Sequence, residues 1–168
     1  DVELSYSSFV YAKDANNQDV LLKQISSDES RVWVEIEDIP QHVLDAFVAV
    51  EDERFFEHDG VDWKRTLTVT VQAVFSDGTA GGSTITQQLI KNITDRSEYS
   101  FQRKIQEIFW ALDLETKMDK SEILELYLNV INLSQGCYGV GAAASYYFAK
   151  ELSQLTLAEC ASIAAITN

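Results

Sequence analysis

The sequence contains no apolar run as long as the roughly 18–20 residues that a membrane-spanning helix requires. Its first residues, Asp1, Val2 and Glu3, also lack the basic and then apolar start of a secretory leader. We therefore expect any membrane anchor of the natural protein to lie outside these 168 residues.

Histidine and cysteine are scarce, with two of each. His42 and His58 alone make a histidine-based metal cage implausible. Cys137 and Cys160 show no CxxC spacing, which argues against a metal set, and the sequence leaves open whether they pair. No Ser-His-Asp or Cys-His combination stands out, so the sequence does not predict a nucleophilic triad.

Basic residues are few: 13 Lys and Arg stand against 27 Asp and Glu, which gives a net charge of −14. A nucleic-acid partner is therefore not expected, because such partners bind a basic face. In so acidic a chain, the cluster of Lys91, Arg96, Arg103 and Lys104 predicts a site for an anion. The alternative is a scatter of charge on a solvated helix face.

With 46% hydrophobic residues, the chain is expected to form one globular domain. Residues 1–39 carry short strand patterns at Phe9–Tyr11, Val20–Leu22 and Arg31–Ile36. From Pro40 onward the apolar residues follow helical spacing. We therefore predict a mainly α (α+β) fold, in which a short β segment precedes a helical region over residues 40–168.

Residues 100–117 give the clearest helical pattern in the chain. The stripe expected to be buried consists of Phe101, Ile105, Ile108, Phe109 and Leu112. On this pattern Arg103, Lys104 and Glu107 lie off the buried stripe.

The stretch Gly81–Asn92 reads Gly-Gly-Ser-Thr-Ile-Thr-Gln-Gln-Leu-Ile-Lys-Asn. Its glycines end a loop, and Ser83 or Thr84 is a good N-cap for the helix that follows. The unpaired N–H groups and the dipole at such a helix start favour an anion. Amide and ammonium donors then recur along the helix at Gln87, Gln88, Lys91 and Asn92. The alternative is an ordinary capped surface helix.

Two glutamates are candidates for proton transfer and charge stabilisation. Glu51 falls on the apolar side of its own helix, an unusual place for a carboxylate unless it has a function. Together with Glu107 and a donor-rich anion site, it fits sugar chemistry with a phosphate leaving group. The alternatives are a solvated pair of Glu51 with Arg54 and a helical salt bridge of Glu107 with Arg103.

Five sequence blocks, in order, carry a resemblance to a known family. They are Glu51-Asp52-x-x-Phe55-x-x-His58-x-Gly60, the whole of Gly81–Asn92, Arg103-Lys104-x-x-Glu107, Ile123-Leu124-Glu125-x-Tyr127-Leu128-Asn129, and Gly139–Lys150. With these blocks the chain resembles the peptidoglycan glycosyltransferases of family 51. These form the polymerase domain of bifunctional penicillin-binding proteins and of monofunctional transglycosylases. The resemblance covers nearly the whole chain.

The resemblance implies a lysozyme-like helical fold with a smaller membrane-facing jaw, placed at about residues 61–80. It also implies lipid II as the substrate, a disaccharide-pentapeptide on undecaprenyl pyrophosphate. Glu51 would be the catalytic base that takes the proton from the acceptor 4-hydroxyl, and an inverting displacement would then form a β-1,4 bond. Glu107 would be the second catalytic carboxylate, which supports the leaving pyrophosphate directly or through a divalent Mg or Mn ion.

Further site residues follow from the matching positions. Those implied to contact substrate are Ser83, Thr84, Gln87, Gln88, Lys91, Asn92, Arg103, Lys104, Asp52, Phe55, His58, Tyr127 and Asn129. The implied partners are lipid II, the nascent glycan strand, the membrane surface, and a transpeptidase domain or other partners in cell-wall synthesis. The implied location is the extracytoplasmic face of the bacterial cell membrane.

Other functions are compatible with parts of the sequence. A lysozyme-like muramidase or lytic transglycosylase would use a raised-pKa acid and a water but no cation cluster. The alternative that is not an enzyme is a scaffold domain in a cell-wall complex. The apolar residues Trp63, Leu67, Val71, Val74 and Phe75 favour either a membrane contact or packing on the domain core.

Overall fold

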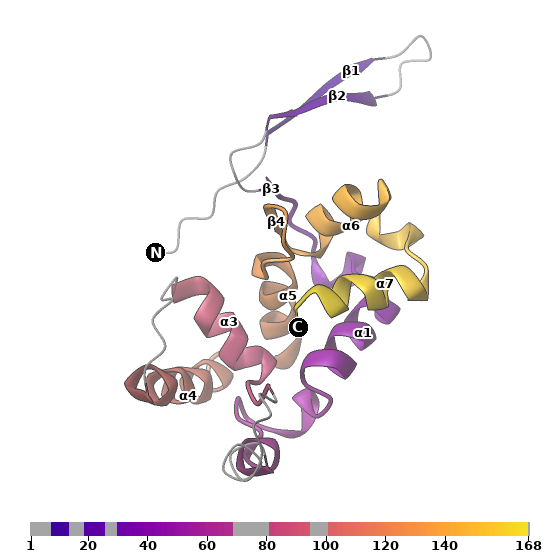
Figure 1. Ribbon diagram of the computed structural model, residues 1–168. Helices are drawn as coiled ribbons and strands as arrows, with labels where there is room; N and C mark the ends of the chain where they lie inside the picture. Colours follow the sequence, from indigo (N-terminus) through magenta and orange to yellow (C-terminus); the bar gives the residue numbers. More distant parts are fainter. Residues whose placement is uncertain (1–7, 14–18, 26–29, 69–80, 95–100, 168) are drawn as a thin grey trace.

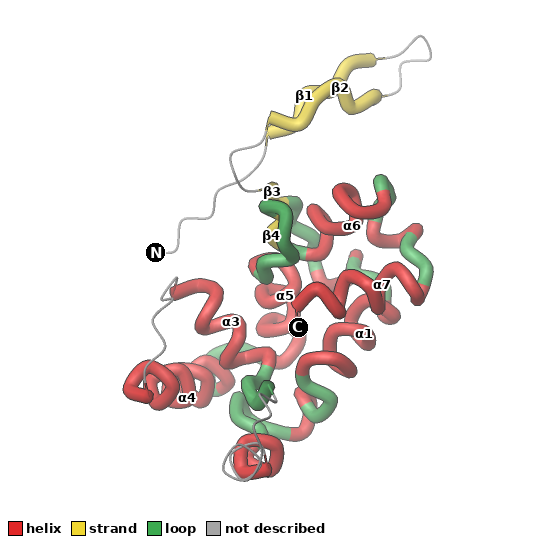
Figure 2. Tube along the Cα trace, in the orientation of Figure 1, coloured by secondary structure: helices red, strands yellow, loops and turns green. Residues whose placement is uncertain are grey.

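The computed structural model describes residues 8–13, 19–25, 30–68, 81–94 and 101–167. These residues form a helical body, from which a two-stranded hairpin projects at the N-terminal side (Figure 1). Helix dominates the trace in Figure 2, and strands are confined to the hairpin and one short pair. The predicted mainly α fold with a short N-terminal β segment is confirmed.

The hairpin consists of β1 (Ser8–Lys13) and β2 (Asp19–Ile25), which pair antiparallel. It contains the two strands predicted at Phe9–Tyr11 and Val20–Leu22. A second, parallel pair joins β3 (Ser30–Arg31) to β4 (Cys137–Tyr138) and brings the start of the body against a loop late in the chain.

The predicted strand over Arg31–Ile36 is wrong beyond its first residue. The Asn129 side chain takes the place of a neighbouring strand, because its Oδ1 accepts from the Val34 N–H at 2.8 Å and its Nδ2 donates to the Val34 carbonyl at 2.8 Å. The Ile36 N–H donates to Glu125 Oε2 at 2.8 Å, and a 3₁₀ turn follows. The backbone polar groups are thus satisfied by side chains of another helix.

Six helices with complete bounds make up the body. They are α1 (Gln41–Glu51), α3 (Ile85–Thr94), α4 (Phe101–Glu115), α5 (Lys120–Val130), α6 (Val140–Phe148) and α7 (Leu157–Ala164). Residues 63–68 are also helical. The 3₁₀ turns are Ile36–Asp38, Phe55–Glu57, Leu152–Gln154 and Ala165–Thr167. Capping boxes at Asp119 and Thr156 fix where α5 and α7 begin.

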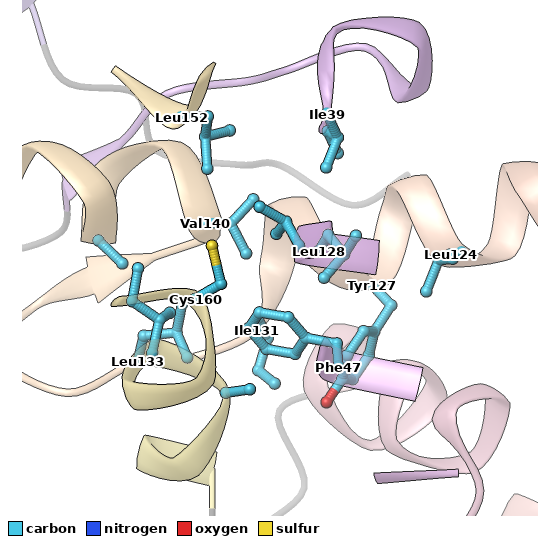
Figure 3. Packing of buried hydrophobic residues seen from close by; sticks show 14 of the residues in the cluster. Ile39, Phe47, Leu124, Tyr127, Leu128, Ile131, Leu133, Val140, Leu152 and Cys160 are labelled. Atoms are coloured by element: carbon cyan, nitrogen blue, oxygen red, sulfur yellow. The ribbon is translucent and has the colours of Figure 1, made fainter. Parts of the chain in front are cut away.

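Helix α5 lies at the centre of the body, with α3 packed against it and with α1 packed against α7 (Figure 1). Its Tyr127 and Leu128 are fully buried. The ring of Phe47, from α1, meets the ring of Tyr127 edge-on, with 6.3 Å between the ring centres (Figure 3). This aromatic contact fixes the distance between α1 and α5 near the end of α1 that carries Glu51.

Helix α4 turns its apolar side outward, so the predicted buried stripe is wrong at two of its residues. Ile105 is 39% exposed and Phe109 is 65% exposed, whereas Glu107 is only 5% exposed. The helix packs against α3, and Glu107 can lie on the inner side because cations from the same helix pair with it. A row of apolar side chains on α4 therefore faces solvent.

The described part of the predicted jaw, residues 61–68, also exposes apolar side chains. Trp63 is 59% exposed and Leu67 is 67% exposed. Val71, Val74 and Phe75 lie outside the described residues. Among the residues that the structure describes, no helix is both long and apolar enough to cross a bilayer.

Asn129→Ala should destabilise the fold because it leaves the partly buried N–H and carbonyl groups of Val34 without their partner. We expect a loss of about 2 to 3 kcal/mol in the free energy of unfolding, measured by urea denaturation. Asn132→Ala, three residues further on and exposed, is the matched control and should change stability by less than about 0.5 kcal/mol. Equal effects of the two substitutions would contradict this structural role for Asn129.

Candidate active site

Glu51 is the last residue of α1 and is 7% exposed. It shares a helix face with the buried Val43 and Phe47, so the register that buries these two apolar residues also buries the carboxylate. Its Oε2 accepts a hydrogen bond from Gln88 Nε2 at 2.6 Å, and its Oε1 accepts one from the Thr167 hydroxyl. A buried carboxylate held by donors from two other segments is not a solvated helix end, so the alternative pairing of Glu51 with Arg54 is excluded.

Backbone N–H groups at the start of α3 donate hydrogen bonds to side chains of the protein itself. Thr84 and Gln87 form a capping box, in which the Gln87 N–H donates to Thr84 Oγ1 at 3.2 Å and the Thr84 N–H donates to Gln87 Oε1 at 3.2 Å. The Ile85 N–H donates to the buried Asp52 carboxylate at 3.0 Å. At the first backbone N–H of α3, the anion that the sequence predicted is therefore the protein's own Asp52.

Glu107 forms ion pairs with two cations. Its Oε1 accepts from Arg103 Nε at 2.9 Å, and its Oε2 lies 3.4 Å from Lys104 Nζ. Lys104 Nζ also donates to Ser83 Oγ at 2.8 Å and to Gln87 Oε1 at 3.3 Å, which links α4 to the start of α3. Glu107 thus holds positive charge beside the stretch Gly81–Asn92.

Glu51 and Glu107 line the same cleft, as the sequence predicted. This cleft has a volume of about 250 Å³ and is lined by Glu51, Arg65, Gly81, Ser83, Gln87, Gln88, Lys91, Asn92, Glu107 and Thr167. Arg103 and Lys104 reach its edge through Glu107. Seven of the residues that the sequence implied therefore line this cleft, from α1, from α3 with the loop before it, and from α4, and Arg103 and Lys104 join them through their pairs with Glu107.

The remaining predicted contact residues lie elsewhere. Asp52, Phe55, Thr84 and Tyr127 are fully buried, and Asn129 is 3% exposed. Each belongs to the core or to a hydrogen bond between elements, so the geometry does not support the prediction that they contact substrate.

His58 differs from the predicted substrate contact as well. Its Nε2 donates to Asp52 at 3.0 Å, and the residue lines a separate cavity of about 350 Å³ together with Trp63 and Leu112. Its contacts are those of a residue that orients Asp52.

Sequence reasoning missed Arg65 and Thr167. Arg65 Nε donates to the Gly81 carbonyl at 3.1 Å, and another guanidinium N–H donates to the Glu51 carbonyl. The backbone N–H of Arg65 donates to Asp62 Oδ1 at 2.9 Å. Burial tends to raise the pKa of Asp62, but the hydrogen bonds from Arg65 and Arg54 outweigh it and leave that pKa below its usual value. Asp62 stands three residues before Arg65, and an Asp at this spacing is a common N-cap. This signal in the sequence could have placed Arg65 in the first turn of a helix.

A protein-held metal does not fit this site. Both Glu107 oxygens face the cations Arg103 and Lys104. Within the part of the chain that the structure describes, no three His, Cys, Asp or Glu side chains form a group that could hold a metal ion. Side-chain cations outnumber carboxylates around the cleft, so this acidic protein offers positive charge to an anion there.

Comparison with known proteins agrees with this geometry. The family described as Transglycosylase matches residues 18–168. The chain belongs to the transglycosylase family. Similar proteins are penicillin-binding protein 1A of Clostridium perfringens (43% identical over 98% of the chain), penicillin-binding protein 4 of Bacillus subtilis (42% over 100%) and penicillin-binding protein 1A of Escherichia coli (43% over 99%). The chain spans 24%, 27% and 19% of these relatives, respectively.

Membership of the transglycosylase family makes the chain a glycosyl-transferring enzyme domain of cell-wall synthesis. The alternative of a non-enzymatic scaffold domain is therefore not supported. The cleft that holds Glu51 and Glu107 is its candidate active site.

Lys91→Ala should weaken binding of a pyrophosphate-bearing substrate analogue, because Lys91 is an exposed cation on the cleft wall. The loss of one charge-assisted contact should cost about 1.5 to 3 kcal/mol of binding free energy, measured by calorimetry. Lys117→Ala removes the same charge from a surface pair with Asp113 and should leave the affinity unchanged. A similar loss in both variants would mean that net charge alone governs binding.

Proposed function

We propose that this domain is a peptidoglycan glycosyltransferase that polymerises lipid II into β-1,4-linked glycan strands and releases undecaprenyl pyrophosphate. The observation that carries the proposal is the shared cleft, in which a buried carboxylate faces a second carboxylate that holds two cations. Glycosyl transfer from a pyrophosphate needs a base on one side and positive charge on the other.

Glu51 is the base in this proposal. Its carboxylate takes the proton of the acceptor 4-hydroxyl while that oxygen forms a bond to C1 of the donor sugar. The bond between C1 and the pyrophosphate oxygen breaks, and the pyrophosphate leaves with the electron pair. Attack opposite the leaving group inverts the α-linked donor to a β-linked product.

Positive side chains stabilise the leaving pyrophosphate. Lys91 lies on the cleft wall, and Arg103 and Lys104 are oriented by Glu107. Arg103 and Lys104 are held by Glu107 before substrate arrives, so they need little reorganisation as negative charge develops. Glu107 is in this account a positioning group for cations, and no step depends on a metal.

The cations also favour a transferase over a muramidase or lytic transglycosylase. Hydrolysis or lytic cleavage of a glycan requires a proton donor near the scissile bond but releases no pyrophosphate. A hydrolase would have no use for Lys91 on the cleft wall or for the two cations that Glu107 holds.

Glu51→Gln should abolish polymerisation and preserve the fold, because the amide keeps the size of the side chain but cannot take a proton. We expect turnover of labelled lipid II to fall by about a hundredfold or more, with an unchanged circular dichroism spectrum. Glu53→Gln, the same change at an exposed position two residues away, is the control and should retain activity. Near wild-type turnover by Glu51→Gln would rule out Glu51 as the base.

The proposed substrate carries a long lipid tail, so the enzyme works at a membrane surface. The exposed side chains of Ile105 and Phe109 on α4, and of Trp63 and Leu67 on the helical residues 63–68, supply an apolar surface for that contact. We place the enzyme at the extracytoplasmic face of the bacterial cell membrane, where the relatives named penicillin-binding proteins suggest a transpeptidase domain as a partner.

Ile105→Asp combined with Phe109→Asp should reduce association with vesicles of anionic and zwitterionic phospholipid, because charges replace two side chains that would enter the interface. Binding should fall by about tenfold, measured by co-sedimentation, with the thermal unfolding midpoint nearly unchanged. Leu157→Asp alters a side chain on α7 that is 69% exposed and serves as the control. Unchanged binding by the double variant would remove α4 from the membrane contact.

A further inference from the structure

Three helices are connected by a chain of hydrogen bonds that ends on Glu51. The Tyr127 hydroxyl, on α5, donates to Gln88 Oε1 at 3.2 Å. Gln88 Nε2, on α3, donates to Glu51 Oε2 at 2.6 Å. The tyrosine is fully buried beneath the cleft, whereas Gln88 lines it.

The direction of this chain is set by chemistry at both ends. An ionised carboxylate can only accept hydrogen bonds, so the Gln88 amide must turn its nitrogen toward Glu51 and its oxygen toward Tyr127. Burial raises the pKa of the Tyr127 phenol far above its ordinary value, and the charges of Glu51 and Asp52 raise it further. The phenol therefore stays protonated and donates.

A flipped amide would be harmful at this position. It would place the Gln88 oxygen against the Glu51 carboxylate, where two acceptors repel, and it would break the hydrogen bond from the Tyr127 hydroxyl to that oxygen. Because the Tyr127 ring is packed against Phe47 (Figure 3), the hydroxyl cannot move away from Gln88 without disturbing the core.

We propose that Tyr127 is a positioning residue for the base Glu51, and that it acts through the Gln88 amide and not by contact with substrate. The phenol donates to the amide oxygen and so holds the amide in the orientation that the carboxylate requires, and the amide then fixes one oxygen of the carboxylate. The other oxygen is held by the Thr167 hydroxyl. This role rests on the proposed polymerisation reaction, in which the orientation of Glu51 matters.

Tyr127→Phe is the direct test, because it removes the hydroxyl and keeps the ring. In lipid II polymerisation, kcat should fall by about fivefold to tenfold, as expected for the loss of one hydrogen bond, while KM stays within about twofold of the wild-type value. In the Gln88→Ala background the same substitution should have no further effect on kcat, since the connection is already broken.

The matched control is Tyr147→Phe, which removes a hydroxyl that donates to the Leu133 carbonyl at 2.7 Å, away from the cleft. It should affect stability only and leave kcat unchanged. Wild-type kcat in Tyr127→Phe, or an equal loss with and without Gln88, would overturn the proposal.

A second measurement does not depend on activity. The side-chain amide signals of Gln88 in a ¹⁵N–¹H spectrum, identified by their absence in Gln88→Ala, should shift or broaden in Tyr127→Phe and stay in place in Tyr147→Phe. Unmoved signals would overturn the positioning role even if the wild-type protein does not polymerise lipid II. A moved signal without any polymerisation would support the contact and refute the proposed reaction.

Discussion

The hydrogen bond from the Ile85 N–H to the buried Asp52 carboxylate joins the two helices on which the cleft depends. Asp52 directly follows α1, and Ile85 is the first residue of α3, so this bond brings the end of one helix to the start of the other. Glu51 and Gln88, one residue before Asp52 and three after Ile85, are thereby brought within hydrogen-bond distance. His58 Nε2 donates to the same carboxylate and keeps it oriented.

A second buried carboxylate, Glu107 on α4, determines the arrangement of the other wall of the cleft. Glu107 is buried on α4 at the expense of the apolar residues Ile105 and Phe109, which face outward. A buried carboxylate needs hydrogen-bond donors or cations to compensate its charge, and for Glu107 the cations Arg103 and Lys104 do so within one helical turn. The same rotation of α4 that places positive charge in the cleft thus creates the apolar surface that we assign to the membrane.

The sequence predicted the helical fold and the two carboxylates facing one cleft, because local spacing and the five blocks are visible without a structure. It failed where a long-range partner decides the outcome. Periodicity placed Ile105 in the core, but the ion pairs of Glu107 determine which side of α4 is buried. Val34 was predicted in a strand, but the side chain of Asn129, 95 residues away, occupies its backbone groups. Tyr127 was assigned to substrate because nothing in its block shows that it lies beneath Gln88.

The Thr167 hydroxyl reaches Glu51 across 116 residues of sequence. During synthesis on the ribosome, α1 therefore emerges long before the turn that completes the surroundings of its carboxylate. Until Ala165–Thr167 has folded against α1, one oxygen of Glu51 lacks this partner. The order of translation thus delays the finished base until the helical body around it has formed, and a nascent chain that ends before Thr167 carries no complete site.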